Sequence, residues 1–441
     1  MKRRAFISKT AVGATGLGLT SALPFSKVFG NASASDKINV ALIGCRSMGF
    51  GVLNHAMTFP DVNCVALCDI DDKYLNQRAQ ELGTNYKSKP RLYKDFRKLL
   101  EDKEVDAVII GTPDHWHCLQ TVAALQAGKD VYVEKPMANT IAECNIMVQA
   151  AKKYSRVVQV GQQQRSSPIF IKAMELVKGG NIGKLRKVNI WANFNYGVGS
   201  EIVPDSAVPG GVDYDMWLGP APVRPFNVNR FHGNWRHFWD YGGGLASDWG
   251  VHLIDMALWA KDIVAGPKEV LTYAGNTFSE PRMRETFDTM TISYPKSDFV
   301  INYDLTAGVQ RGPWDKPYGL AFIGDKGTLV VNRNTLEVFP EWDESKKANK
   351  TDSFKMDQAD DTHKQHVRNF LDCVKTRKAP VCPPEVGRAT AIHLHAANIS
   401  ARVGEPMLRW NDQKNEFENS KAANDLVTPQ YRKPWTLPKI T

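Results

Sequence analysis

The feature that most constrains the fold of this chain is a regular alternation of short apolar runs with longer helical segments between residues 38 and 160. The apolar runs have the length of buried strands and are expected at residues 38–43, 62–67, 105–110, 131–133 and 157–160. Continuous apolar strands joined by helices are typical of a parallel sheet with helices on both faces. We therefore predict a doubly wound α/β domain over residues 35–161.

In the remainder of the chain, most of the expected strands follow one another at the spacing of β-hairpins. Its helices are expected at residues 169–178, 245–260, 367–374 and 388–403, and its strands at 185–194, 270–277, 287–294, 299–305, 320–323 and 329–331. This order favours a mostly antiparallel sheet with helices on one face. We predict a second, α+β domain over residues 162–441 that binds substrate and supports oligomerisation.

The N-terminal segment has the three parts of an export signal. Arg3-Arg4 and Lys9 form a charged start, residues 10–23 form a weakly apolar run, and Ala32-Ser33-Ala34 is a small-residue cleavage pattern. The paired arginines indicate the twin-arginine route. A membrane anchor is the alternative, but the run is too short and too rich in glycine to span a bilayer. We expect residues 1–34 to be removed on export to the periplasm, with no membrane association afterwards.

Charge and cysteine content exclude several classes of protein. The formal net charge is +9, and residues 1–34 carry five of the cations and no acid, which leaves about +4 on the mature chain. No basic run or basic–aromatic stripe follows, so we expect no nucleic-acid partner. The seven cysteines are scattered, odd in number and without C-x-x-C spacing, so we expect core thiols and no metal site.

A glycine-rich turn follows the first expected strand, at the position where a parallel α/β domain binds a pyrophosphate. The turn is Gly44-Cys45-Arg46-Ser47-Met48-Gly49, with Arg46 in place of the usual middle glycine. Asp69 ends the second strand, where an acid accepts hydrogen bonds from the adenosine ribose. A carboxylate there repels a 2′-phosphate, so we predict NAD as the cofactor. NADP is the alternative cofactor, because the guanidinium of Arg46 beside that ribose can hold a phosphate.

Three further segments together resemble the Gfo/Idh/MocA oxidoreductases, the relatives of glucose–fructose oxidoreductase and inositol dehydrogenase. They are residues 111–117 (GTPDHWH), residues 134–136 (EKP) and residues 242–252 (GGGLASDWGVH), in an order that fits the family over nearly the whole chain. The resemblance implies a Rossmann domain whose Thr112, Pro113, His117, Glu134 and Lys135 lie at the cofactor. It also implies that Lys135, Asp248 and His252 form the catalytic set.

The chemistry of these residues agrees with that implication. Asp248 and His252 are four residues apart on an expected helix and so share one face, with Asp255 three residues further on. A carboxylate beside an imidazole favours its charged form, which suits a proton shuttle. Lys135 is expected at the carboxyl edge of the sheet, where partial desolvation beside a cationic nicotinamide lowers an amine pKa. Either Lys135 or His252 is the base.

The stretch between residues 195 and 239 mixes flat aromatic rings with polar groups, as a carbohydrate site requires. We expect a sugar to contact His252 and residues of this stretch and its surroundings: Gln162, Arg165, Asn193, Trp217, Arg230, Trp235 and Arg236. The alternative is that these rings form a packed loop core or a subunit interface.

The sequence therefore predicts an exported NAD(P)-dependent oxidoreductase that transfers hydride between a sugar CH–OH group and a tightly bound nicotinamide. An NAD-dependent glycosidase or lyase that oxidises its sugar only transiently is the alternative. Export favours this glycosidase or lyase, because any exported enzyme must recycle its cofactor. The intact Glu134-Lys135-Pro136 disfavours it. A binding protein without turnover is a third reading, disfavoured by the three retained catalytic residues. By analogy with the family we also expect a homo-oligomer.

Overall fold

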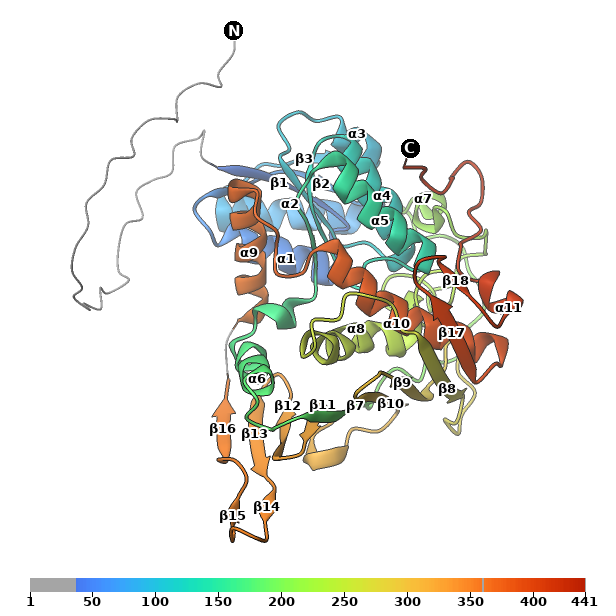
Figure 1. The fold of residues 1–441 in the computed structure, drawn as a ribbon. Coiled ribbons are helices and arrows are strands. Elements are labelled where there is room, and N and C mark those ends of the chain that lie inside the picture. Colours follow the sequence, from blue (N-terminus) through green and yellow to red (C-terminus); the bar gives the residue numbers. More distant parts are fainter. Residues whose placement is uncertain (1–36, 359–360, 441) are drawn as a thin grey trace, which may run out of the picture.

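The computed structural model describes residues 37–358 and 361–440, so the export signal predicted over residues 1–34 lies outside the described residues. The first domain contains a six-stranded parallel sheet of order β3-β2-β1-β4-β5-β6 (Figure 1). Its strands are β1 (Ile38–Ile43), β2 (Val62–Cys68), β3 (Arg91–Tyr93), β4 (Ala107–Ile110), β5 (Asp130–Val133) and β6 (Val158–Val160). The predicted Rossmann-type sheet is confirmed, with the short exposed β3 as a strand that the apolar pattern missed.

Helices cover both faces of this sheet because its strands are apolar on both sides. They are α1 (Ser47–Met57), α2 (Asp72–Tyr86), α3 (Phe96–Leu100), α4 (Asp114–Gln126) and α5 (Ile141–Tyr154). Val40 and Leu42 of β1 face α1 and α2, whereas Ala41 and Ile43 face α3, α4 and α5. The successive residues of one strand thus belong to two separate cores.

The second domain is built on a ten-stranded mixed sheet of order β16-β13-β12-β11-β7-β10-β9-β8-β17-β18. The strands are β7 (Leu185–Phe194), β8 (Glu269–Gly275), β9 (Thr289–Pro295), β10 (Val300–Ala307), β11 (Tyr318–Gly324), β12 (Gly327–Val331), β13 (Thr335–Pro340), β16 (Phe354–Asp357), β17 (Met407–Asn411) and β18 (Glu416–Phe417). β7 and β10 pair in parallel and the other neighbours are antiparallel, which confirms the predicted mostly antiparallel sheet. A separate hairpin joins β14 (Trp342–Asp343) to β15 (Ala348–Asn349).

Helices α8 and α10 lie between the two sheets (Figure 1). The helices of this part are α6 (Pro168–Lys178), α7 (Tyr214–Leu218), α8 (Gly244–Trp259), α9 (Thr362–Thr376), α10 (Pro384–Val403) and α11 (Lys421–Asn424), with short 3-10 turns η1 (Gln163–Ser166), η2 (Trp235–His237) and η3 (Pro313–Asp315). α6, α8 and α10 pack on the same sheet face in one apolar core. α10 also contacts α5, so it joins the domains.

Helix α9 returns to the first domain, which a boundary at residue 161 does not anticipate. Val367, Phe370 and Leu371 pack in the same core as α1 and α2. The Phe370 ring meets the Tyr132 ring of β5 edge-on, with the centroids 5.8 Å apart. Arg368 pairs with Asp61 at 2.8 Å, which fastens the helix at the surface. The first domain therefore needs this distant helix to cover one face of its sheet.

All seven cysteines fall in the described part of the chain, where they are buried and unpaired. Most of them pack among the apolar residues of the first domain, as core thiols do. None of the helices between residues 37 and 440 is both long and apolar enough to cross a membrane.

We predict that Phe370→Ala lowers the free energy of unfolding by about 3–5 kcal/mol, because it empties a buried ring site under the first sheet. Urea denaturation followed by tryptophan fluorescence measures the change. Lys378→Ala, an exposed position just beyond the same helix, is the matched control and should stay within about 0.5 kcal/mol of the wild type. A loss below 1 kcal/mol for Phe370→Ala would show that α9 contributes little to this core.

Candidate active site

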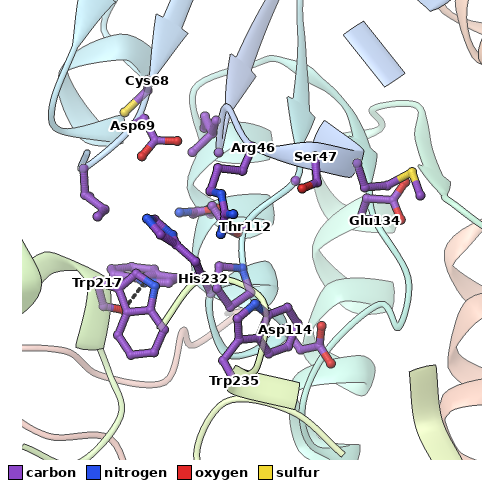
Figure 2. A pocket seen from close by; sticks show the side chains of 18 of the residues that line it. Arg46, Ser47, Cys68, Asp69, Thr112, Asp114, Glu134, Trp217, His232 and Trp235 are labelled. Atoms are coloured by element: carbon purple, nitrogen blue, oxygen red, sulfur yellow. Dashed lines mark hydrogen bonds between the residues drawn. The ribbon is translucent and has the colours of Figure 1, made fainter. Parts of the chain in front are cut away.

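The candidate site is a cleft at the carboxyl ends of β1, β2, β4 and β5, closed on its other side by the loop that precedes α8. Figure 2 shows Arg46, Asp69 and Thr112 on the sheet side and Trp217, His232 and Trp235 opposite them. The lining includes nine of the eleven predicted cofactor residues: Gly44, Arg46, Ser47, Met48, Asp69, Thr112, Pro113, Glu134 and Lys135. Gly49 and His117 lie behind them. This is the sheet edge at which doubly wound domains bind ligands.

The glycine turn is tightly packed and leaves a helix end open to the cleft. Gly44 has a φ of +90°, which favours glycine. A Cβ on Gly49 would overlap the carbonyl oxygen of Gly44, and one on Gly111 would overlap the Cα of Gly49. Helix α1 then begins without a side-chain cap at Arg46, so its first amides are free to bind an anion.

Asp69 is oriented by the backbone around it. Its Oδ2 accepts from the Cys45 amide at 2.6 Å and its Oδ1 from the Asp71 amide at 3.0 Å, and burial raises its pKa. The carboxylate lines the cleft directly after β2. The Arg46 guanidinium lies over the Tyr74 ring, 4.6 Å from the centroid. The turn, the open helix end and this acid together fit the diphosphate and ribose of NAD.

His117 supports the cofactor end from behind. Its Nδ1 lies 2.8 Å from the Pro136 carbonyl oxygen and its Nε2 lies 2.9 Å from that of Thr112. Burial lowers its pKa to about 4, so the ring is neutral and donates to one carbonyl at a time. The sequence places His117 at the cofactor, whereas the structure gives it contacts to two turns that line the cleft.

Lys135 and Asp248 meet across the two domains. The Lys135 Nζ lies 2.5 Å from Asp248 Oδ1 and donates to the Asp248 carbonyl oxygen at 2.9 Å. The Arg236 Nε donates to the same carboxylate oxygen at 3.0 Å. Burial alone would raise the pKa of Asp248, but the charges of Lys135 and Arg236 hold it well below its usual range. Asp248 is therefore an ionised carboxylate shared by two cations.

His252 is not paired with Asp248, contrary to the expectation drawn from their spacing. The two cations take the carboxylate, and Asp255 pairs instead with Arg165 at 2.8 Å. Nδ1 of His252 is buried without a hydrogen-bond partner in the described structure. Burial and the charges of Lys135 and Arg333 lower the pKa of His252 well below its ordinary value. Its imidazole is therefore neutral, with a ring nitrogen left free.

The residues predicted to bind substrate fall into two groups. Trp217, Trp235 and Arg236 line the cleft together with His232. The two tryptophans also belong to an apolar cluster of the loop, so they pack the loop and wall the cleft at once.

The other predicted substrate residues have partners away from the cleft. Arg230 pairs with Asp205 at 3.0 Å, and the Asn193 side chain donates to the Arg311 carbonyl at 2.7 Å. Arg165 is held by Asp255, and buried Gln162 faces Thr390 at 3.5 Å. These four side chains stabilise the second domain in the described structure, and neither they nor His252, the eighth predicted substrate residue, line the cleft.

Three residues near His252 were missed by the sequence reasoning. Trp249 lies edge-on to His252 with ring centroids 5.9 Å apart, and its Nε1 donates to the Tyr196 hydroxyl at 2.5 Å. The Arg333 guanidinium lies 4.7 Å from the centre of the Trp249 ring. Trp249 stands inside the 242–252 segment and was detectable there. Arg333 follows β12 in a tight turn with no local pattern to mark it.

We predict that Gly49→Ala weakens NAD binding at least about tenfold, because the new methyl group displaces the turn that carries the open helix end. Titration calorimetry with NAD measures the change. Gly51→Ala, on the same helix with nothing within 4 Å of the added Cβ, is the matched control and should bind like the wild type. Equal NAD affinities for the two variants would show that the turn does not contribute to NAD binding.

Comparison with known proteins identifies the two domains. Residues 38–162 match the model of the Gfo/Idh/MocA oxidoreductase family described as an NAD-binding Rossmann fold. Residues 172–273 match the model of its C-terminal alpha/beta domain. Among curated proteins, the chain is 28% identical over 203 residues to a "Glycosyl hydrolase family 109 protein" of Shewanella pealeana, covering 42% of this chain and 44% of that protein. It is 33% identical over 149 residues to an "Inositol 2-dehydrogenase" of Salmonella typhimurium, covering 33% of this chain and 43% of that protein.

These matches span less than half the length of either relative. Solved structures extend the similarity of fold to most of the chain. Aldose-aldose oxidoreductase from Caulobacter crescentus, complexed with glycerol, superposes with a TM-score of 0.64 at 20% identity over 85% of this chain and 99% of its own. WlbA dehydrogenase from Bordetella pertussis, in complex with NADH and UDP-GlcNAcA, gives 0.62 at 18% identity over 85% of this chain and 99% of its own. On its two matching domains and on the cleft between them, this chain belongs to the Gfo/Idh/MocA oxidoreductase family and has an NAD-binding Rossmann domain.

Proposed function

We propose that this protein oxidises a CH–OH group of a sugar or glycoside with NAD held in the cleft. The observation that carries the proposal is the position of the Lys135 Nζ. It lies on the cleft, 2.5 Å from an ionised carboxylate, where the cofactor turn meets an aromatic loop and the α8 helix. The similarity to an inositol 2-dehydrogenase and the shared fold with an aldose-aldose oxidoreductase support a polyol or sugar substrate.

Each group around Lys135 has a definite part in this reaction. Bound NAD supplies the acceptor for the hydride that leaves the sugar carbon. Lys135 exchanges the proton of the reacting hydroxyl, and Asp248 fixes the position of its amine through two contacts. His252 is neutral and its buried Nδ1 has no partner in the described structure, so we assign it the positioning of the groups around Lys135. Trp217 and Trp235 wall the cleft and exclude water.

A second candidate is a glycosidase or lyase that oxidises its sugar transiently and restores it at the end of the cycle. The similarity to a glycosyl hydrolase family 109 protein favours it. The intact Glu134-Lys135-Pro136 segment supports the dehydrogenase instead, because it keeps the lysine at which the glycosidase branch of the family departs. In both reactions the same cofactor cleft is used.

We further propose that the protein is exported by the twin-arginine route with its cofactor already bound. Arg3-Arg4 and the apolar run after them support this, since that route carries folded proteins. Fractionation of cells producing the full chain measures the location. Recovery of the protein only in the cytoplasm, at full length, would contradict the proposal.

The proposed function is tested on the purified protein, by mass spectrometry for bound dinucleotide and by absorbance at the nicotinamide band. A panel of sugars and glycosides is then added. Reduction that persists until a keto-sugar is supplied establishes the dehydrogenase. Cleaved glycoside without net reduction establishes the second candidate, and no dinucleotide under any loading refutes both.

We predict that Lys135→Met lowers kcat by about 10²- to 10⁴-fold, because it removes the proton-transfer group. Lys135→Arg keeps a cation for Asp248, but a guanidinium does not release its proton, so its kcat should fall comparably while NAD still binds. Steady-state kinetics and NAD titration separate the two effects. Lys89→Met, at an exposed position of the same domain, is the control. Wild-type kcat in Lys135→Arg would show that the lysine acts only through its charge.

A further inference from the structure

Arg333 is a partly buried cation that has no carboxylate partner among the described residues. It lies in the turn between β12 and β13, where its Nε donates to Gln164 Oε1 at 3.0 Å. No ion pair within residues 37–358 and 361–440 includes its guanidinium, whose outer nitrogens make no hydrogen bond there either. Arg165 and Arg236, by contrast, each face a buried carboxylate. Arg333 therefore keeps one edge of its planar fork available for an anion.

Even partial burial of a cation is unfavourable unless an opposite charge or a polar partner compensates it. Burial lowers the pKa of Arg333, whereas Tyr318, Asp248 and Tyr196 act in the opposite direction. The Trp249 ring supplies a partial compensation, with its centroid 4.7 Å from the guanidinium carbon. An aromatic face and one amide oxygen leave the positive charge in excess. An anionic group of a ligand would complete its coordination.

The surroundings of Arg333 connect it to the proposed active site. Trp249 is adjacent to Asp248 in α8 and its ring contacts that of His252. Gln164, which accepts from Arg333, donates through Nε2 to the His252 carbonyl at 2.9 Å. The charges of Arg333 and Lys135 both lower the pKa of His252, so both cations lie near it. Arg333 thus lies close to His252, one of the residues of the proposed active site.

The same neighbourhood has the flat apolar surface that a sugar ring packs against. Trp249 contacts Phe194 and Tyr318 with ring centroids 4.4 and 4.8 Å apart. The Tyr196 ring, 48% exposed, continues this aromatic surface. An aromatic surface beside an unpaired guanidinium suits a sugar that carries a negative charge.

A cavity next to Arg333 agrees with this arrangement. Gln164, Ser167, Gln358 and His363 line it with polar groups. Asp361 is the one acid in its lining, and that carboxylate caps α9 through the Lys364 amide and lies 3.3 Å from His55 Nδ1. Asp361 thus has hydrogen-bonding partners of its own, whereas the Arg333 guanidinium has no anionic partner.

We propose that Arg333 binds the carboxylate of an acidic sugar, so that the preferred substrates of the cleft are uronic acids or their glycosides. This inference rests on the proposed function, because it assigns the substrate class of the same site. A carboxylate accepts two parallel hydrogen bonds from one guanidinium edge, which fixes the orientation of the sugar ring. A neutral sugar leaves the guanidinium without an anionic partner and binds more weakly.

The test uses the holoprotein and three probes of the same shape: methyl β-D-glucuronide, its neutral methyl ester and methyl β-D-glucoside. The galacto- and N-acetylgluco-configured sets are run in parallel. Titration calorimetry measures binding without any requirement for turnover. We expect the acid to bind most tightly in at least one set. Arg333→Gln should weaken that acid about 10- to 100-fold while changing the ester and the glucoside less than about twofold.

Arg186→Gln, an exposed arginine on β7 without an ion pair in the described structure, should leave all three affinities unchanged. Arg333→Lys retains the positive charge but loses the planar guanidinium. It should therefore bind the acid more tightly than Arg333→Gln but less tightly than the wild type. A purely structural role for Arg333 would weaken acid and neutral probes equally and lower the midpoint of thermal unfolding. That result, or no acid preference in the wild type, overturns the proposal.

Hydride transfer is recorded separately at the nicotinamide band. Acid binding that depends on Arg333 without any reduction would refute the proposed function and leave the assignment of Arg333 standing. Reduction by neutral sugars with no acid preference would support the function and refute the assignment. The proposed function and the assignment of Arg333 are therefore refuted by different measurements.

Discussion

The Lys135–Asp248 contact is the interaction on which the candidate site depends, because it joins the two domains at the place where we propose that the chemistry occurs. Lys135 follows a strand of the first sheet, Asp248 lies on α8 of the second domain, and Arg236 reaches the same carboxylate from the intervening loop. A buried carboxylate without these cations would be strongly unfavourable. One acid therefore fixes three distant segments relative to one another, and the cleft takes its width from them.

The packing of the surrounding helices keeps Lys135 and Asp248 in contact. α8 and α10 lie between the two sheets, and α10 contacts both α8 and α5. The buried Arg165–Asp255 pair holds the start of the second domain against α8 one turn beyond His252. α9 then crosses back to complete the core of the first domain. Because the chain passes between domains more than once, a shift of one domain strains several packed interfaces instead of a single hinge.

The sequence predicted the strands and turns that follow from a local pattern of residues. It did not predict which distant side chains compete for the same carboxylate. Apolar runs marked most strands, and the glycines around Gly44 marked the turn because only glycine fits there. The spacing of Asp248 and His252 correctly placed both on one helix, but it did not show that Lys135 and Arg236 would take the carboxylate. Arg333 lies in a sheet turn whose neighbours come from α8 and η1, so no window of sequence contains its environment. The short β3 was missed because its residues are exposed and lack the apolar signal.

The loop before α8 has a consequence for the cofactor as well as for the substrate. Its backbone joins the end of β2 through the Asp213 amide, which donates to the Ile70 carbonyl at 3.0 Å, and through the Asp72 amide, which donates to the Gly211 carbonyl at 3.0 Å. The His232 Nε2 adds a contact of 2.9 Å to Asp71. These bonds lie beside Asp69, where the adenosine ribose is expected, so the second domain covers the cleft that the first domain opens. The cofactor cleft is therefore built from both domains, and its ribose end is bordered by contacts that join them.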